Sequence, residues 1–326
     1  MLKSTILILL LTWSLIGQSQ ETKLHLVSDV WPPFTNVPGQ QAFAIELVKE
    51  SLNRSGVIVQ NEVIEDVNIT NYINEKKFDG SSALWRSADR EKTLIFSAPY
   101  LQNQLVLVGK KGSDVSAASF SELKGKKVAI VNYYDYGSSV DEASQVEFIK
   151  GVNQQKNLDK LLKGEVDYIL VDALMIQYLL NYQSEEVEKY LEVGEHPLVR
   201  RSLHFALRKD VPNAKEIIEQ FNKEVVNMVV DGSYNRILQI NWIRADVDGD
   251  GRLEMVQGGR QAGMDAPTSS YDVWLVNSNG AETDYSDEFY VDGNFYENWD
   301  NIPQEYKSAP ITQEDVQKVT ILDFNF

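Results

Sequence analysis

Residues 78–100, FDGSSALWRSADREKTLIFSAPY, carry the pattern around which the chain is organised. The run at 80–85 is small and apolar, which predicts the end of a buried strand, and a polar turn follows it. A short helix is expected to begin near Arg90. The backbone amides of a helix start and a planar guanidinium can together bind a carboxylate group. The alternative interpretation is an exposed arginine between Asp89 and Glu91.

Strands and helices alternate on both sides of this stretch. Residues 24–28 have the pattern of a short strand, and the apolar spacing of residues 43–53 predicts an amphipathic helix. The same alternation returns in the second hundred residues, which favours a doubly wound α/β fold with a largely parallel sheet. Ligands of such sheets bind at the carboxyl ends of the strands, where Asp29, Ser82 and Asp172 fall.

Several short motifs follow one another along the chain: VWPPF at 30–34, AFAIEL at 42–47, FSAPY at 96–100, LKGKKV at 123–128, GEVD at 164–167 followed by Asp172, and DGSY at 231–234 through Trp242. In this order they resemble the motifs of the family 3 periplasmic solute-binding proteins. Together they cover residues 24–243. The resemblance implies a two-lobed, type II periplasmic-binding-protein fold, in which two crossover strands form a hinge between the lobes.

We therefore expect five segments along the chain. Residues 1–20 have a basic start, a short apolar core and a small, polar end, as in a cleaved secretory signal peptide. Residues 21–105 should form the first part of lobe 1, residues 106–202 lobe 2, and residues 203–243 the return to lobe 1. Residues 244–326 lie beyond the resemblance. Their alternating aromatic and acidic side chains and their Asp-Gly and Asn-Gly pairs predict a small β-rich appendage.

The charge of the chain is concentrated at one end. The net charge is −17, and after residue 244 there are 17 acidic side chains against 4 basic ones. Such a tail argues against nucleic acid or anionic lipid as a partner and makes a cation a candidate ligand. The chain has no cysteine, and so no disulfide, thiol nucleophile or lipid attachment through an N-terminal cysteine. With the signal peptide, this predicts a soluble, monomeric, periplasmic protein.

The resemblance also implies where a ligand binds. In the family, the arginine matching Arg90 holds the α-carboxylate of a ligand, and the acid matching Asp172 holds its α-ammonium. Because these residues lie on different lobes, a zwitterion that binds both favours the closed form. Trp31 matches the aromatic residue of the family that stacks on the ligand, and Asp29 lies near the position of the acid that neighbours this aromatic residue in the family. Ser82 matches a family position that hydrogen-bonds the ligand. Asp172 could also cap the following helix, and Asp29 and Trp31 could simply shape the double-proline turn.

Aromatic residues stand where the family usually has small ones. Trp85 replaces a serine or threonine of many relatives, so it either narrows the pocket or adds a second stacking wall. Tyr134 and Tyr136 lie in the run NYYDYG at 132–137, which replaces a loop that typically bears glycine and threonine. They could face an aromatic, cyclic or peptide-like ligand, or they could be partly exposed loop residues.

Residues 246–254, DVDGDGRLE, form a second motif. Carboxylates at positions 1, 3, 5 and 9 and a backbone carbonyl at position 7 can surround one hard cation. These positions are Asp246, Asp248, Asp250, Glu254 and Arg252. Position 12 is Gln257, where an EF-hand needs a bidentate glutamate, and the flanks are strand-like, so the motif resembles the calcium loops of FG-GAP-type hairpins. We expect a structural Ca²⁺; the alternative is an acidic turn without an ion.

Three functions fit these features. The leading one is a non-catalytic receptor that captures a small carboxylate-bearing, amino-acid-like ligand and presents it to an ABC permease or a sensor. The second is an enzyme on the same scaffold, such as a dehydratase, although none of the histidines, His25, His196 and His204, lies beside a plausible nucleophile in the sequence. The third is a calcium-dependent binding or docking module formed by the acidic tail.

Overall fold

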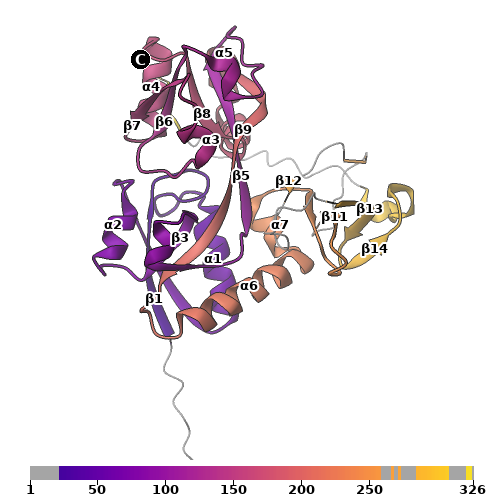
Figure 1. The fold of residues 1–326 in the computed structure, drawn as a ribbon. Coiled ribbons are helices and arrows are strands. Elements are labelled where there is room, and N and C mark those ends of the chain that lie inside the picture. Colours follow the sequence, from indigo (N-terminus) through magenta and orange to yellow (C-terminus); the bar gives the residue numbers. More distant parts are fainter. Residues whose placement is uncertain (1–21, 258–265, 268–270, 273–283, 308–320, 325–326) are drawn as a thin grey trace, which may run out of the picture.

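The protein consists of two α/β lobes joined by two long strands, with a small β-sheet at the side of one lobe (Figure 1). The computed structural model describes residues 22–257, 266–267, 271–272, 284–307 and 321–324. The expected signal peptide, residues 1–20, lies outside these ranges. Within them, no helix is both long and apolar enough to cross a bilayer.

The first lobe contains the beginning of the chain and a return segment. Its strands are β1 (Thr22–Asp29), β2 (Val57–Ile64), β3 (Gly80–Trp85) and β4 (Leu94–Phe96), and its helices are α1 (Phe43–Arg54), α2 (Ile69–Asn74), α6 (Ala214–Val230) and α7 (Ser233–Leu238). Strand β1 pairs in parallel with both β2 and β3. Helix α1 packs on α6 through apolar residues such as Leu47 and Phe221, both fully buried. The amphipathic helix predicted at 43–53 is thus confirmed.

The second lobe repeats the alternation of strand and helix. Its strands are β6 (Lys127–Val131), β7 (Glu147–Gly151) and β8 (Tyr168–Asp172), its helices are α3 (Ser138–Asp141), α4 (Gln154–Lys163) and α5 (Ala173–Tyr190), and a 3₁₀ turn covers Phe120–Leu123. Strand β6 lies between β7 and β8 and is parallel to both. The carboxyl ends of these strands face the first lobe, so Asp172 ends a strand at the boundary between the lobes.

Strands β5 (Leu101–Lys110) and β9 (Leu191–Arg208) run through both lobes. They pair antiparallel from Leu101 opposite Leu203 to Lys110 opposite Leu191, with register shifts near Val106. They join the lobe sheets into the order β2-β1-β3-β9-β5-β8-β6-β7. The strands β2, β1 and β3 of the first lobe, and β7, β6 and β8 of the second, are therefore parallel to one another. The pairs that involve the hinge strands β5 and β9 are antiparallel. The predicted two-lobed α/β fold with two crossovers is confirmed.

Gly80 allows β3 to approach β9 closely. A Cβ atom at this position would lie 1.9 Å from the carbonyl oxygen of Ala206, far inside van der Waals contact. Only glycine lets the two backbones lie this close. Gly80 thus allows β3 of the first lobe to pair closely with the hinge strand β9.

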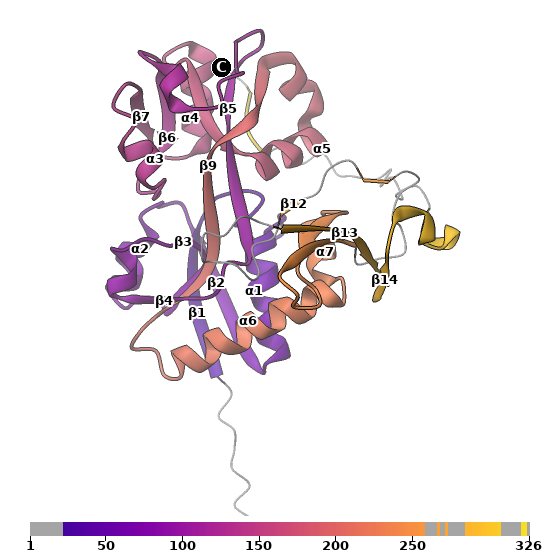
Figure 2. The same ribbon diagram turned by 45° about the vertical axis from the view of Figure 1, so that its right-hand side comes forward.

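A separate sheet follows α7. Its strands are β10 (Ile243–Ala245), β11 (Arg252–Gln257), β12 (Tyr271–Asp272), β13 (Asp284–Val291) and β14 (Asn294–Tyr296), in the order β12-β10-β11-β13-β14, and 3₁₀ turns cover Trp299–Asn301 and Gln304–Tyr306. Figure 2 shows this sheet beside α6 and α7. Ile243, Ala245 and Val256 belong to the same buried cluster as Leu238 of α7, which attaches the sheet to the first lobe. The predicted β-rich appendage is confirmed.

Residues 321–324, the last that the structure describes, lie on the other lobe. Leu322 and Phe324 are buried against the core of the second lobe, and Phe324 stacks on Tyr190 of α5 with ring centroids 6.0 Å apart. Helix α5 is kinked at Gln183, whose side chain accepts hydrogen bonds from the amides of Ile321 and Leu322 at 2.8 and 3.0 Å. The C-terminal extension therefore contacts both lobes.

Candidate functional site

Arg90 lies where the two lobes meet. It opens a single 3₁₀ turn, Arg90–Lys92, so the short helical stretch expected to begin near Arg90 is present as one 3₁₀ turn. One guanidinium nitrogen donates to the carbonyl of Trp85 at 2.7 Å, and another donates to the carbonyl of Tyr133, on the second lobe, at 3.3 Å. Burial lowers the pKa of Arg90, whereas the charges of Asp135 and Asp29 raise it. Among the described residues, no carboxylate forms an ion pair with Arg90.

Aromatic side chains fill the space beside Arg90. The ring centroids of Trp31, Trp85 and Tyr134 lie 5.4 to 5.5 Å from one another, in edge-to-face arrangements. Tyr136 adds a fourth ring 5.4 Å from Trp85, and its hydroxyl accepts a hydrogen bond from the amide of Val131. The remaining cavity is only about 20 Å³ in volume. It is lined by Asp29, Trp31, Val67, Ile69, Ala83, Leu84, Trp85, Arg90 and Tyr134.

Asp29 ends β1 inside this cluster and is 4% exposed. Tyr134, from the second lobe, donates its hydroxyl to the Asp29 carboxylate at 2.6 Å, so this hydrogen bond crosses the cleft. Burial raises the pKa of Asp29 to about 6, against the lowering effects of the Tyr134 hydrogen bond and the Arg90 charge. Asp29 and Arg90 thus place an acid and a cation on the wall of one cavity.

Asp172 ends β8 and is fully buried. It caps α5 by accepting a hydrogen bond from the amide of Leu174 at 2.8 Å, and it also accepts one from the side-chain amide of Asn103 at 2.9 Å. The other end of the Asn103 amide accepts from the indole of Trp85 at 2.7 Å. Burial raises the pKa of Asp172 to about 7. Asp172 is not among the residues that line the cavity, so the helix cap and the Asn103 bond are the roles that the contacts support.

Ser82, on β3, is not among the residues that line the cavity. Its hydroxyl donates to the side-chain carbonyl of Asn61 at 2.7 Å, and its own carbonyl accepts from the hydroxyl of Tyr100. Ala83, Leu84 and Trp85, the next three residues of β3, line the cavity, whereas Ser82 does not. The structure therefore does not bring Ser82 together with the other predicted ligand residues.

Two further polar residues belong to the site, and the sequence reasoning missed both. Asn103, on β5, connects Trp85 to Asp172, as described above. Arg201, on β9, lies over the ring of Trp85 at 6.0 Å and donates to the carbonyl of Arg86 at 2.6 Å and to Asp135 at 3.4 Å. The available signals were the polar run at 102–104 and the arginine pair at 200–201.

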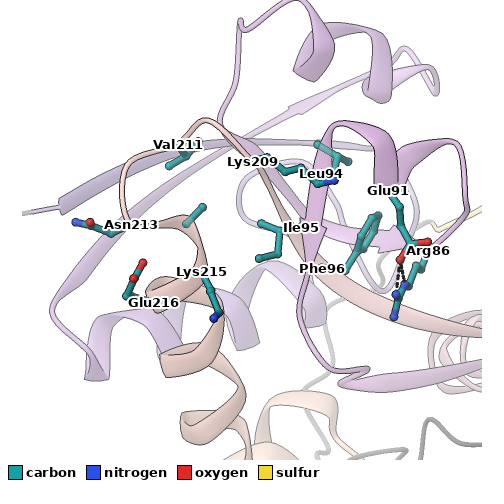
Figure 3. A pocket seen from close by; sticks show the side chains of 11 residues that line it. Arg86, Glu91, Leu94, Ile95, Phe96, Lys209, Val211, Asn213, Lys215 and Glu216 are labelled. Atoms are coloured by element: carbon teal, nitrogen blue, oxygen red, sulfur yellow. Dashed lines mark hydrogen bonds and ion pairs between the residues drawn. The ribbon is translucent and has the colours of Figure 1, made fainter.

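A larger hollow lies elsewhere on the first lobe, between β4 and the start of α6 (Figure 3). It encloses about 720 Å³ and is lined by residues that include Phe96, Lys209 and Lys215. Its two charged residues at one end, Arg86 and Glu91, pair with each other. None of the predicted ligand residues lines it, and we therefore place the candidate site between the lobes.

The acidic loop lies outside the cleft, between β10 and β11. Carboxylate oxygens of Asp246, Asp248 and Glu254 lie within 4.8 Å of one another. The carboxylate of Asp250 instead bonds to the guanidinium of Arg252 at 2.8 Å. The structure thus brings together three of the predicted cation ligands and directs Asp250 away from them.

Comparison with known proteins identifies the family to which this two-lobed chain belongs. Residues 25–244 match the model of the bacterial extracellular solute-binding proteins, family 3. The chain belongs to this family. The match spans the two lobes and the hinge, which confirms the resemblance stated for residues 24–243, and it ends before the acidic loop.

Several curated proteins and solved structures are similar to this chain. ABC transporter arginine-binding protein 1 of Escherichia coli K12 is 22% identical over 72% of this chain and 97% of its own length. Sensor protein EvgS of Escherichia coli O157:H7 is 31% identical over 41% of this chain, which is 11% of that sensor. The structure of an ancestral arginine-binding protein bound to arginine has a TM-score of 0.56 and 26% identity, covering 67% of this chain and 96% of its own. The GluR0 ligand-binding core from Nostoc punctiforme, at 21% identity and a TM-score of 0.54 over 66% of this chain and 96% of its own, shares the fold.

Proposed function

We propose that this family 3 protein is a periplasmic receptor that captures a small, carboxylate-bearing, amino-acid-like ligand between its lobes. It then presents the ligand to an ABC permease or to a sensor. The observation that carries the proposal is the guanidinium of Arg90, which lines the cavity and, within the described part of the chain, donates to two backbone carbonyls and to no carboxylate. A carboxylate would replace a neutral acceptor by a charged one, and charge-assisted bonds are roughly twice as strong as neutral ones.

Ligand entry requires the lobes to separate. A cavity of about 20 Å³ holds about one water molecule and not an amino acid. Opening at β5 and β9 breaks the bond between Tyr134 and Asp29 and the bond between Arg90 and the carbonyl of Tyr133. The ligand then takes the place of these interlobe contacts, and it favours closure because it contacts both lobes at once.

Asp29 is the better candidate than Asp172 for the ammonium group of the ligand. Asp29 lines the cavity together with Arg90, whereas Asp172 does not line it and bonds to Asn103 and to the amide of Leu174. Trp31 and Trp85 supply aromatic walls between which a side chain could stack. The site so defined suits a zwitterion with a flat or apolar side chain.

A binding screen tests this function. The purified chain, unfolded and refolded to remove carried ligand, is screened with single amino acids by thermal shift and calorimetry. We expect at least one to bind saturably and to be recovered chemically unchanged, since turnover would indicate an enzyme. A ligand at 100 times its Kd stabilises the folded state by about 2.7 kcal/mol, which a melting curve detects easily.

The matched pair Arg90→Ala and Arg86→Ala tests the site. The change at Arg90 should weaken binding at least 100-fold, because a buried carboxylate loses its charged donor, worth about 3 kcal/mol. Arg86 lies on the same lobe, and its exposed side chain pairs only with Glu91, so its removal should leave the affinity within about threefold. Equal affinities of the two variants would refute the assignment.

A further inference from the structure

The turn between β10 and β11 gathers three carboxylates. One oxygen each of Asp246, Asp248 and Glu254 lies within 4.8 Å of the others. Three like charges at this separation repel one another unless a cation lies between them. Since acidic clusters are common on protein surfaces, the cluster by itself does not identify a site.

Glu254 is a buried carboxylate with one oxygen that lacks a hydrogen-bond donor among the described residues. This residue is 1% exposed, and its Oε2 accepts a hydrogen bond from the amide of Val247 at 3.0 Å. Its Oε1 is buried and has no hydrogen-bond partner among the residues that the structure describes. Arg244 and Arg252, the nearest cations in the sequence, contact other oxygens, at Leu253, Ser286 and Asp250. A buried carboxylate oxygen without a donor is costly, and a metal ion is one partner that removes the cost.

The loop holds the first carboxylate in place. The amides of Gly249 and Gly251 donate to the two oxygens of Asp246 at 2.6 and 3.0 Å. Both glycines have positive φ angles, +82° and +93°, which place the backbone in a conformation that L side chains rarely adopt. The amide of Asp250 donates to Asp248 at 3.0 Å. Each of these bonds uses a side-chain oxygen while leaving it a further lone pair for a ligand.

We propose that Asp246, Asp248 and Glu254 bind one Ca²⁺ ion in this loop. The donors are all hard oxygens, with no histidine or cysteine among them, which suits Ca²⁺ rather than Zn²⁺. The backbone carbonyl of Arg252, at position 7 of the motif, and water would supply the remaining oxygen ligands. Asp250 is left out, because its carboxylate pairs with Arg252.

The bound ion has a structural consequence. The loop closes the hairpin of β10 and β11, and Ile243 and Val256 of these strands are fully buried in the core that continues into α7. An ion that holds the two strands together therefore strengthens the attachment of the appendage to the first lobe (Figure 2). This site is independent of the cleft between the lobes, so it can exist whatever the cleft binds.

Calcium titration of the full chain tests the site. After treatment with a chelator, Ca²⁺ should bind with a stoichiometry of one in isothermal titration calorimetry and raise the melting temperature, and Mg²⁺ should bind at least tenfold more weakly. Asp248→Asn retains the acceptor for the Asp250 amide but removes one charge, and it should weaken Ca²⁺ binding at least tenfold. Glu254→Gln retains the acceptor for the Val247 amide and should have the same effect.

Asp292→Asn is the matched control. Asp292 is an exposed acid in the turn between β13 and β14, and the change removes the same charge outside the loop. Its Ca²⁺ affinity should stay within twofold of the unchanged chain. The proposal is overturned if the folded chain binds no Ca²⁺ up to about 5 mM, above the ~10⁻⁴ to 10⁻³ M range of extracellular calcium modules. It is overturned equally if Asp248→Asn binds Ca²⁺ as tightly as Asp292→Asn.

Discussion

Asp29 is a single residue whose burial sets how stability depends on pH. Its pKa of about 6 in the folded protein lies above the ordinary value of 3.8, so the folded state holds the proton more tightly than the unfolded state. The stability from this group is fully present below about pH 4 and is lost as the pH rises through about 6. The difference between the two pKa values corresponds to about 3 kcal/mol.

We predict that Asp29→Asn raises the free energy of unfolding at pH 7.5 by about 2 to 3 kcal/mol. The amide cannot ionise, and its carbonyl still accepts the hydroxyl of Tyr134. Near pH 4 the two proteins should be equally stable within about 1 kcal/mol. Urea unfolding at both pH values measures this. Asp172, with a pKa of about 7, is unchanged in both proteins, so only their difference reports Asp29. Parallel pH profiles would contradict the prediction.

At the scale of elements, the segment between β6 and α3 of the second lobe forms hydrogen bonds with the first lobe. It carries Tyr134, whose hydroxyl bonds to Asp29, and Tyr133, whose carbonyl accepts from Arg90. Neighbouring tyrosines thus have different environments, because Tyr134 is packed among Trp31 and Trp85 while Tyr133 is 57% exposed.

We predict that Tyr134→Phe lowers the free energy of unfolding by about 1 to 3 kcal/mol at pH 7.5. The change leaves the buried Asp29 carboxylate without its donor from the second lobe, and an unsatisfied buried group of this kind costs about that much. Tyr133→Phe, the adjacent control, should shift stability by less than about 0.5 kcal/mol, since its side chain is exposed. Chemical denaturation of both variants measures the difference. A loss at Tyr133 as large as that at Tyr134 would show that the hydroxyl bond is not the cause.

At the scale of the whole molecule, the described residues of the C-terminal extension contact both lobes. Its sheet continues the core of the first lobe, and its last described residues, Leu322 to Phe324, lie on the second lobe. Gln155 of α4 binds both the amide and the carbonyl of Asp323, at 2.7 and 2.8 Å. Opening of the cleft therefore has to occur with the extension attached at both ends or with one of its ends released.

We predict that Phe324→Ala destabilises the second lobe by about 3 kcal/mol. The ring is 8% exposed and stacks on Tyr190, so its removal leaves a cavity against α5. Amide hydrogen exchange should become faster in α5 (Ala173–Tyr190) and stay unchanged in α1 (Phe43–Arg54). Phe295→Ala, which removes a ring that is 44% exposed, should leave exchange in α5 as it was. Equal protection of α5 in all three proteins would mean that the end of the chain contributes nothing to the second lobe.

The sequence by itself determined the local elements and their order. Apolar spacing placed α1, the ends of β1 and β8 at Asp29 and Asp172, and the hairpin strands around the acidic loop. Each of these elements depends on side chains within a few positions of one another, so its pattern can be recognised in the sequence. The motifs spread over residues 24–243 likewise predicted the two lobes, because together they belong to one family.

The tertiary structure alone decided which residues share the cleft. Tyr134 and Asp29 are 105 positions apart, and Asn103 and Asp172 are 69 positions apart. No local sequence pattern therefore predicts either hydrogen bond. Packing also left Ser82 bonded to Asn61 and outside the cavity, and it placed the carbonyl of Tyr133, from the other lobe, within hydrogen-bond distance of Arg90. Such pairings depend on how separate elements pack, because hydrogen bonds and burial join whatever atoms the fold brings together.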